Sequence, residues 1–162
     1  MAHQILEPEE AQNGLVLIGI RRGGESLARR LAAEITAIGN EAPGLGFLNI
    51  NLYRDDDVAR ELPESEIRSE ITGKTVVIVD DVLYTGRTVR AALDAVTDLG
   101  RPRAIRLAVL VDRGLRELPV QADYVGKSIP SSRREHIDVV LSPQPSDDDS
   151  VALVLDEDRA AT

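Results

Sequence analysis

Two adjacent carboxylates, Asp80 and Asp81, follow directly after the apolar run 76–79. Three residues later, small and polar positions open a helical pattern: Thr85, Gly86, Arg87 and Thr88. A helix N-terminus offers unpaired N–H groups and partial positive charge, and glycine lets an anion approach the backbone closely. Two carboxylates just before it would accept hydrogen bonds from the hydroxyls of a sugar carrying that anion. The pattern therefore predicts a site for a ribose 5-phosphate.

The same residues also fit an ordinary helix N-terminus, with Thr85 as the cap and the aspartates near the positive end of the dipole. That interpretation does not explain why two acids follow a buried strand directly. Other phosphate motifs are absent, because Gly73 and Lys74 enter a strand where a Walker loop needs a helix. The run "GIRRGG" also lacks the G-x-G-x-x-G spacing.

Strand and helix patterns alternate around this motif, which predicts an α/β fold with a central parallel sheet covered by helices on both faces. The last segment, 151–155, is expected at the edge of the sheet. The expected strands are 15–20, 48–53, 75–79, 104–111, 124–125, 136–141 and 151–155, and the expected helices are 25–38 and 87–99. Ligands of such sheets bind at the carboxyl ends of the strands, so the turns at 19–24 and 80–88 are the expected site.

The segment 54–74 is polar and has no sustained apolar period. A connection of this length is unusual inside a compact domain. We expect a flexible flap or a small exposed hairpin here, within a single domain that covers residues 1–162.

Composition excludes several classes of protein. The 162 residues include no cysteine, which rules out disulfides, thiolate metal sites and cysteine nucleophiles and weakly favours a cytoplasmic location. No apolar run is long enough to cross a bilayer, and the N-terminus shows no export signal. The net charge of −9 argues against sequence-indifferent binding to nucleic acid or anionic lipid, and four aromatic residues are too few for a base-stacking platform.

The stretch "VVIVDDVLYTGRT" closely resembles the signature of type I phosphoribosyltransferases, which bind phosphoribosyl diphosphate (PRPP). Together with "NINLYRDD" and the sequence from Asp80 through "VDRGLRELPVQADYVGKSIPSSR", it is similar to the PyrR family over about residues 14–141. This family comprises pyrimidine operon attenuators with uracil phosphoribosyltransferase activity. The resemblance implies a type I phosphoribosyltransferase fold with a flap.

The resemblance also implies roles for individual residues. Asp80 and Asp81 match the acids that contact ribose, and Thr85–Thr88 match the 5-phosphate loop. A purine-using relative often has an acid at the position of Tyr84, so a pyrimidine base is favoured. The other implied positions are the pyrophosphate turn (Arg21, Arg22, Gly23, Gly24), the start of the flap (Arg54, Asp55) and the surroundings of the uracil pocket (Arg113, Tyr124, Val125).

The implied reaction is displacement of pyrophosphate from PRPP by N1 of uracil, which gives UMP. We expect Asp80, Asp81 and Arg54 to act in catalysis. The implied cofactor is Mg²⁺, bound mainly through PRPP rather than through a metal site of the protein's own. The resemblance further implies a homo-oligomer, either a dimer or a tetramer.

A regulator is the alternative to an enzyme: a nucleotide-sensing, RNA-binding attenuator with weak or no catalysis. Its partner would be pyrimidine leader RNA, with PRPP and UMP as opposing effectors. The candidate RNA contacts are His3, Arg133 and Arg134, although each also fits an ordinary exposed residue. The acidic net charge and the short segment before Gly14 lower this expectation.

Two further features depart from the family pattern. Relatives commonly have Thr-Arg-Gly in the pyrophosphate turn, whereas this chain has Arg22-Gly23-Gly24, which moves the guanidinium by one place. The expected flap looks shortened and carries few basic residues. The altered turn lowers the expected rate of catalysis.

Overall fold

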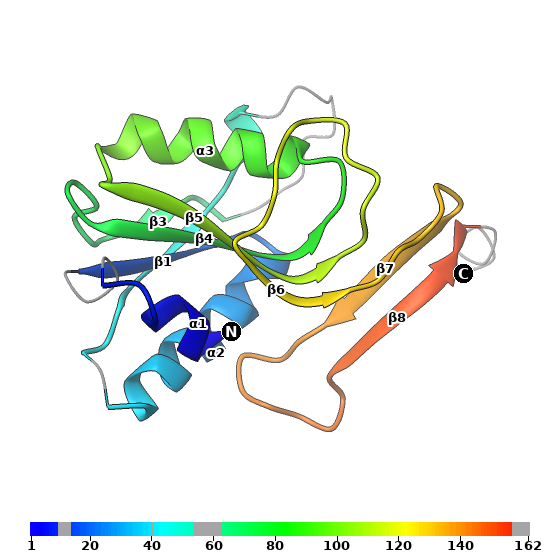
Figure 1. The fold of residues 1–162 in the computed structure, drawn as a ribbon, viewed down its shortest axis with the longest axis horizontal. Coiled ribbons are helices and arrows are strands. Elements are labelled where there is room, and N and C mark those ends of the chain that lie inside the picture. Colours follow the sequence, from blue (N-terminus) through cyan, green and yellow to red (C-terminus); the bar gives the residue numbers. More distant parts are fainter. Residues whose placement is uncertain (10–13, 40, 54–62, 157–162) are drawn as a thin grey trace.

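A computed structural model describes residues 1–9, 14–39, 41–53 and 63–156 of the chain. Its centre is a six-stranded sheet in the order β3-β2-β1-β4-β5-β6 (Figure 1). Neighbouring strands are parallel except for β3, which runs antiparallel to β2 at the edge. The strands are β1 (Leu15–Ile20), β2 (Gly44–Leu48), β3 (Glu66–Ile67), β4 (Thr75–Leu83), β5 (Ala104–Asp112) and β6 (Tyr124–Ser128).

Helices cover both faces of this sheet (Figure 1). Alternate residues of β1 enter two separate apolar clusters, because successive side chains of a strand point to opposite faces. Ile18 packs in the cluster that contains α3 (Arg87–Leu99), and Leu17 packs in the cluster that contains α2 (Gly23–Ala37). The short helix α1 (Ala2–Leu6) lies against α2 and buries Ile5.

Several of the expected boundaries are wrong, and the strand expected over 124–125 in fact continues to Ser128. The strand expected over 48–53 ends at Leu48, and a 3-10 turn, η2 (Asn51–Tyr53), follows it. The Asn49 side chain causes this turn, since its oxygen accepts the backbone N–H of Asn51 at 3.0 Å. In contrast, β4 continues past Val79 to Leu83, because β5 pairs with it over that whole length. Asp80 and Asp81 therefore lie within a strand rather than in a turn.

The last two strands do not join the main sheet. β7 (Glu135–Val140) and β8 (Ser150–Leu155) pair with each other in an antiparallel hairpin that projects from the body of the molecule (Figure 1). The expectation of an edge strand at 151–155 is therefore wrong. Residues 129–134 carry the chain away from β6, and the hairpin leaves Leu153 and Leu155 about half exposed.

Part of the expected flap, residues 54–62, lies outside the described residues, so the flap stays a prediction. In the described part of the chain, none of the helices combines the length and the apolar character needed to cross a membrane.

Candidate functional site

A pocket of about 430 Å³ lies at the carboxyl ends of β1 and β4, where the parallel sheet predicts a ligand site. Polar groups from the β1–α2 turn, the end of β4 and the start of α3 meet apolar side chains from the hairpin. The lining residues are Ile20, Arg21, Arg22, Gly23, Ser26, Ile50, Asn51, Asp80, Asp81, Val82, Thr88, Val139 and Leu141.

The two aspartates occupy different environments although they are neighbours in the strand. Asp80 is 6 % exposed, and its Oδ1 accepts the backbone N–H of Asp81 at 3.0 Å. Burial raises the pKa of the Asp80 carboxyl well above its ordinary value, and the nearby charge of Asp81 raises it further. Asp81 is partly exposed and accepts the N–H of Val82 at 2.7 Å. An approaching cation would therefore stabilise the ionised form of Asp80.

The turn after β1 lies directly against the end of β4. A Cβ atom at Gly23 would overlap the carboxylate of Asp81, and one at Gly24 would overlap the carbonyl oxygen of Val79. Glycine at both positions is thus what lets the start of α2 approach the aspartates. Beside this turn, the basic residues Arg21 and Arg22 also line the pocket.

The start of α3 has the backbone form of an anion site. Its cap residue is Gly86, whose φ of 93° lies in the left-handed region that favours glycine. No side chain caps the helix, although Thr85 Oγ1 accepts the N–H of Arg87 at a long 3.4 Å. The alternative interpretation, in which Thr85 is an ordinary N-cap, is therefore wrong. Thr88, in the first turn, lines the pocket.

Eight of the predicted contacts are described by the structure but are not among the residues that line this pocket: Gly24, Tyr84, Thr85, Gly86, Arg87, Arg113, Tyr124 and Val125. Arg113 is 4 % exposed and lies over the ring of Tyr84, with 4.1 Å from its Cζ to the ring centroid. Its guanidinium donates hydrogen bonds to Ser131 and Ser132, each at 2.8 Å, and to the carbonyl oxygen of Glu135. Arg113 therefore ties the segment before β7 to the end of β5. Tyr124 and Val125 pack against the two apolar clusters instead.

The remaining predicted residues fall elsewhere. Arg54 and Asp55 lie outside the described residues. His3 is exposed on α1, whereas Arg133 and Arg134 are exposed in the segment just before β7. The structure does not bring His3 together with the two arginines.

The sequence interpretation missed several lining residues. Ser26 lies at the start of the helix predicted over 25–38, next to the predicted turn, and this position offered a signal for it. Val139 and Leu141 gave no such signal, because only the docking of the hairpin brings them to the pocket. Asn51 was not predicted as a lining residue because a strand was expected where η2 lies.

The carboxylates of Asp80 and Asp81 fit a Mg²⁺ ion that takes most of its oxygen ligands from a phosphorylated substrate. Among the described residues, no group of three or more His, Cys, Asp or Glu side chains is placed to hold a metal by itself.

Comparisons with known proteins agree with this geometry. Residues 1–144 match the family model of the phosphoribosyl transferase domain. A protein of Pelotomaculum thermopropionicum named Bifunctional protein PyrR is 54% identical over 145 residues, which cover 87% of this chain and 80% of the relative. A protein of the same name from Elusimicrobium minutum is 49% identical over 162 residues, covering 98% and 90%.

The fold also occurs in solved structures. The hypoxanthine phosphoribosyltransferase of Trypanosoma cruzi, in a mutant complexed with the product IMP, aligns with a TM-score of 0.66. The alignment covers 91% of this chain and 70% of that chain at 24% identity. At that identity the similarity concerns the fold alone.

Proposed function

This chain belongs to the PyrR family of phosphoribosyltransferases, and on that premise we propose that it forms UMP and pyrophosphate from uracil and PRPP. The family and its α/β fold, both predicted from the sequence, are confirmed. One observation carries the proposal. The paired aspartates, the β1–α2 turn and the first turn of α3 all meet in one pocket.

Each part of PRPP has a matching group in this arrangement. The 5-phosphate binds at the first turn of α3, where backbone N–H groups and the Thr88 hydroxyl supply donors. The ribose hydroxyls donate to Asp80 and Asp81. The pyrophosphate lies at the β1–α2 turn, where Arg21 and Arg22 supply positive charge.

The residues act on the charges that develop as the bond between ribose and pyrophosphate breaks. Positive charge grows on the ribose ring beside the carboxylates of Asp80 and Asp81, and negative charge grows on the departing pyrophosphate beside Arg21 and Arg22. Groups already positioned at developing charge lower the barrier without reorganising at the moment of reaction. Mg²⁺ bound through PRPP and these carboxylates would neutralise part of the leaving group's charge.

Membership of the PyrR family supports uracil as the acceptor base. The base would meet the apolar side chains that the hairpin contributes to the pocket, Val139 and Leu141. Position 84 holds a tyrosine, whose ring lies against the guanidinium of Arg113, so this position offers no acid to a purine ring. These features support a pyrimidine over a purine.

The direct test measures nucleotide formation from PRPP and Mg²⁺ with four acceptors: uracil, orotate, hypoxanthine and adenine. We expect UMP from uracil to dominate. Equal or greater product from hypoxanthine or adenine would contradict the base assignment, and no product from any acceptor would contradict the enzyme.

Regulation of pyrimidine genes is the second proposed function, because the relatives are named bifunctional. The proposed RNA contacts are Arg133 and Arg134, exposed before β7, with His3 as a weaker candidate. Filter binding with pyrimidine leader RNA at several salt concentrations tests it, since each phosphate contact adds about 0.7 to 0.9 to the slope of log affinity against log salt. No binding, or binding that ignores salt, would exclude the regulator.

The same preparation tests the proposed assembly. We expect sedimentation to give the mass of a dimer or a tetramer, and a monomer at working concentrations would contradict that expectation.

A further inference from the structure

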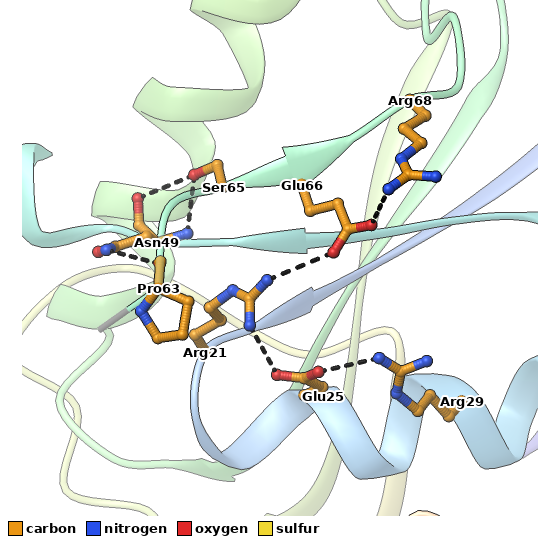
Figure 2. A network of polar contacts seen from close by, with 8 residues as sticks. All are labelled: Arg21, Glu25, Arg29, Asn49, Pro63, Ser65, Glu66 and Arg68. Atoms are coloured by element: carbon orange, nitrogen blue, oxygen red, sulfur yellow. Dashed lines mark hydrogen bonds and ion pairs between the residues drawn. The ribbon is translucent and has the colours of Figure 1, made fainter.

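Five charged side chains form a continuous chain of ion pairs beside the pocket (Figure 2). Arg21 lies at its centre, between Glu25 of α2 at 3.2 Å and Glu66 of β3 at 3.7 Å. Each glutamate also binds an outer arginine through its other oxygen: Arg29 contacts Glu25 at 3.0 Å, and Arg68 contacts Glu66 at 2.8 Å. Of the five, only Arg21 lines the pocket in the described structure.

The two partners of Arg21 are unequal. The contact to Glu25 is a hydrogen bond, whereas the contact to Glu66 is longer and the Glu66 side chain is 47 % exposed. The Arg21 side chain is only 11 % exposed, and its Nε is buried without a hydrogen-bond partner in the described part of the chain. A guanidinium held in this way has unused donor capacity, and its contact to Glu66 is the one that an incoming anion can replace most easily.

Glu66 is held in place by the backbone around it. β3 pairs Glu66 with Phe47 of β2, and the Cζ of Arg21 lies 5.5 Å from the centroid of the Phe47 ring. Just before it, the Ser65 hydroxyl accepts the N–H of Asn49 at 2.9 Å, and the Asn49 side chain donates to the carbonyl oxygen of Pro63 at 3.0 Å (Figure 2). Strand pairing and these hydrogen bonds therefore keep the carboxylate next to Arg21.

We propose that Glu66 is a positioning residue that lowers the affinity of the pocket for a diphosphate by competing with it for the guanidinium of Arg21. The proposal rests on the proposed function, in which the diphosphate lies at the β1–α2 turn. The Glu66 carboxylate and the diphosphate are both anions, so they repel each other and need the same donor. Arg68 acts in the opposite sense, because its ion pair with Glu66 partly neutralises the carboxylate that faces Arg21.

The competition makes opposite predictions for two neighbouring residues. Glu66→Gln should tighten the binding of inorganic pyrophosphate with Mg²⁺ by about two- to fivefold, the range for a partly exposed ion pair. Arg68→Gln should weaken it, because Glu66 then binds Arg21 alone. In the double variant Glu66→Gln/Arg68→Gln, the effect of Arg68→Gln should disappear, since it acts through Glu66.

The experiment titrates the full chain and its variants with inorganic pyrophosphate and Mg²⁺ in a calorimeter. The matched control is Glu64→Gln, which removes the same charge two residues away and has no described contact with Arg21. The KM for PRPP should fall in Glu66→Gln with a smaller change in kcat. The difference in KM between Glu66→Gln and the control Glu64→Gln should shrink at high salt. A residue that only supports the fold would not produce a lower KM.

The outcomes separate the two levels of the argument. Pyrophosphate binding by the unaltered chain, with equal affinities in Glu66→Gln and Glu64→Gln, would overturn the competition and leave the proposed function standing. An effect of Arg68→Gln that persists in the double variant would also overturn it. Absence of pyrophosphate binding and of turnover in the unaltered chain would instead overturn the proposed function, and the competition with it.

Discussion

Asp80 and Asp81 are residues of the same type at adjacent positions of one strand, yet they lie in different environments. Side chains of adjacent strand residues point to opposite faces. Asp80 is almost fully buried, whereas Asp81 is partly exposed beside Gly23, and both line the pocket. Three predictions concern single residues at this point.

Asp81→Asn should lower turnover and leave the fold intact. The change removes one negative charge beside the ribose, and a hydrogen bond that involves a charged group is worth about 1.5 to 3 kcal/mol, or about ten- to a hundredfold in rate. Steady-state assays with uracil and PRPP measure the effect. Asp94→Asn, on the exposed side of α3, serves as the control. Full activity in Asp81→Asn would remove the proposed ribose contact.

Asp80→Asn should stabilise the protein without ligand at neutral pH. Because burial raises the pKa of Asp80 in the folded state, the folded protein holds this proton at a pH where the unfolded chain has lost it. The unaltered protein therefore loses stability as the pH rises from the ordinary carboxyl range towards the raised pKa, and the variant does not. The amide keeps the acceptor for the N–H of Asp81. Denaturant unfolding from pH 4 to 8 should show the two stability curves diverge with rising pH. Parallel curves would contradict the prediction.

Gly23→Ala should displace the carboxylate of Asp81, since the added Cβ would overlap it. We expect a loss of stability of about 1 to 3 kcal/mol, typical of overpacking, together with lower turnover. In an Asp81→Ala background the overlapping atoms are gone, so Gly23→Ala should then cost much less. Equal costs in the two backgrounds, measured by denaturant unfolding, would show that no such close approach exists.

At the scale of elements, Arg113 joins three segments that are separate in the sequence. It extends from the end of β5, lies over Tyr84 after β4, and binds the segment 131–135 that leads into β7. Arg116 adds a second tie, since it donates to the carbonyl oxygen of Tyr84 at 2.9 Å and to Asp112 at 2.6 Å. The contacts of Arg113 fix where the hairpin begins, and thereby where Val139 and Leu141 meet the pocket.

Arg113→Lys should loosen the hairpin while the main sheet stays folded. Lysine lacks the planar fork that serves several acceptors and stacks on Tyr84, and the lost hydrogen bonds are worth about 1.5 to 3 kcal/mol. Hydrogen exchange should become faster for the amides of β7 and β8 and stay unchanged for those of β1. Arg106→Lys, whose partner Asp123 is on the surface, is the control. Faster exchange throughout the chain would indicate a general loss of stability instead.

At the scale of the whole molecule, the hairpin is held at a second point. Arg30 of α2 donates to the carbonyl oxygens of Ser142 and Gln144 and pairs with Asp149 at 2.7 Å, so it binds the loop between β7 and β8 to the helix. The hairpin therefore contacts the body through Arg113 at one end and through Arg30 at the other.

Arg30→Gln should expose the loop 142–149 to protease. Hydrogen bonds from the N–H of Ser142 and from Arg30 lower the pKa of Asp149. The ionised carboxylate therefore stabilises the attached loop fully above the ordinary carboxyl pKa of about 3.9, and this stabilisation is lost as the pH falls through the lowered value. Cleavage of the unaltered protein by an acid-active protease should rise only below about pH 4. The variant should be cut readily at all pH values, unlike the control Arg90→Gln. Resistance of Arg30→Gln to cleavage would contradict this second attachment.

The sequence by itself determined the elements whose signal is local. The apolar run at β1, the apolar period of α3 and the pair Asp80–Asp81 after a buried stretch were enough to predict the parallel sheet and its site, because strand burial, helix period and the chemistry of a helix start are properties of consecutive residues. Only the tertiary structure decided the rest. Glu66 meets Arg21 through the pairing of β3 with β2, and Val139 reaches the pocket through the docking of a hairpin by Arg113 and Arg30. Such contacts join residues far apart in the chain, and no local pattern encodes them.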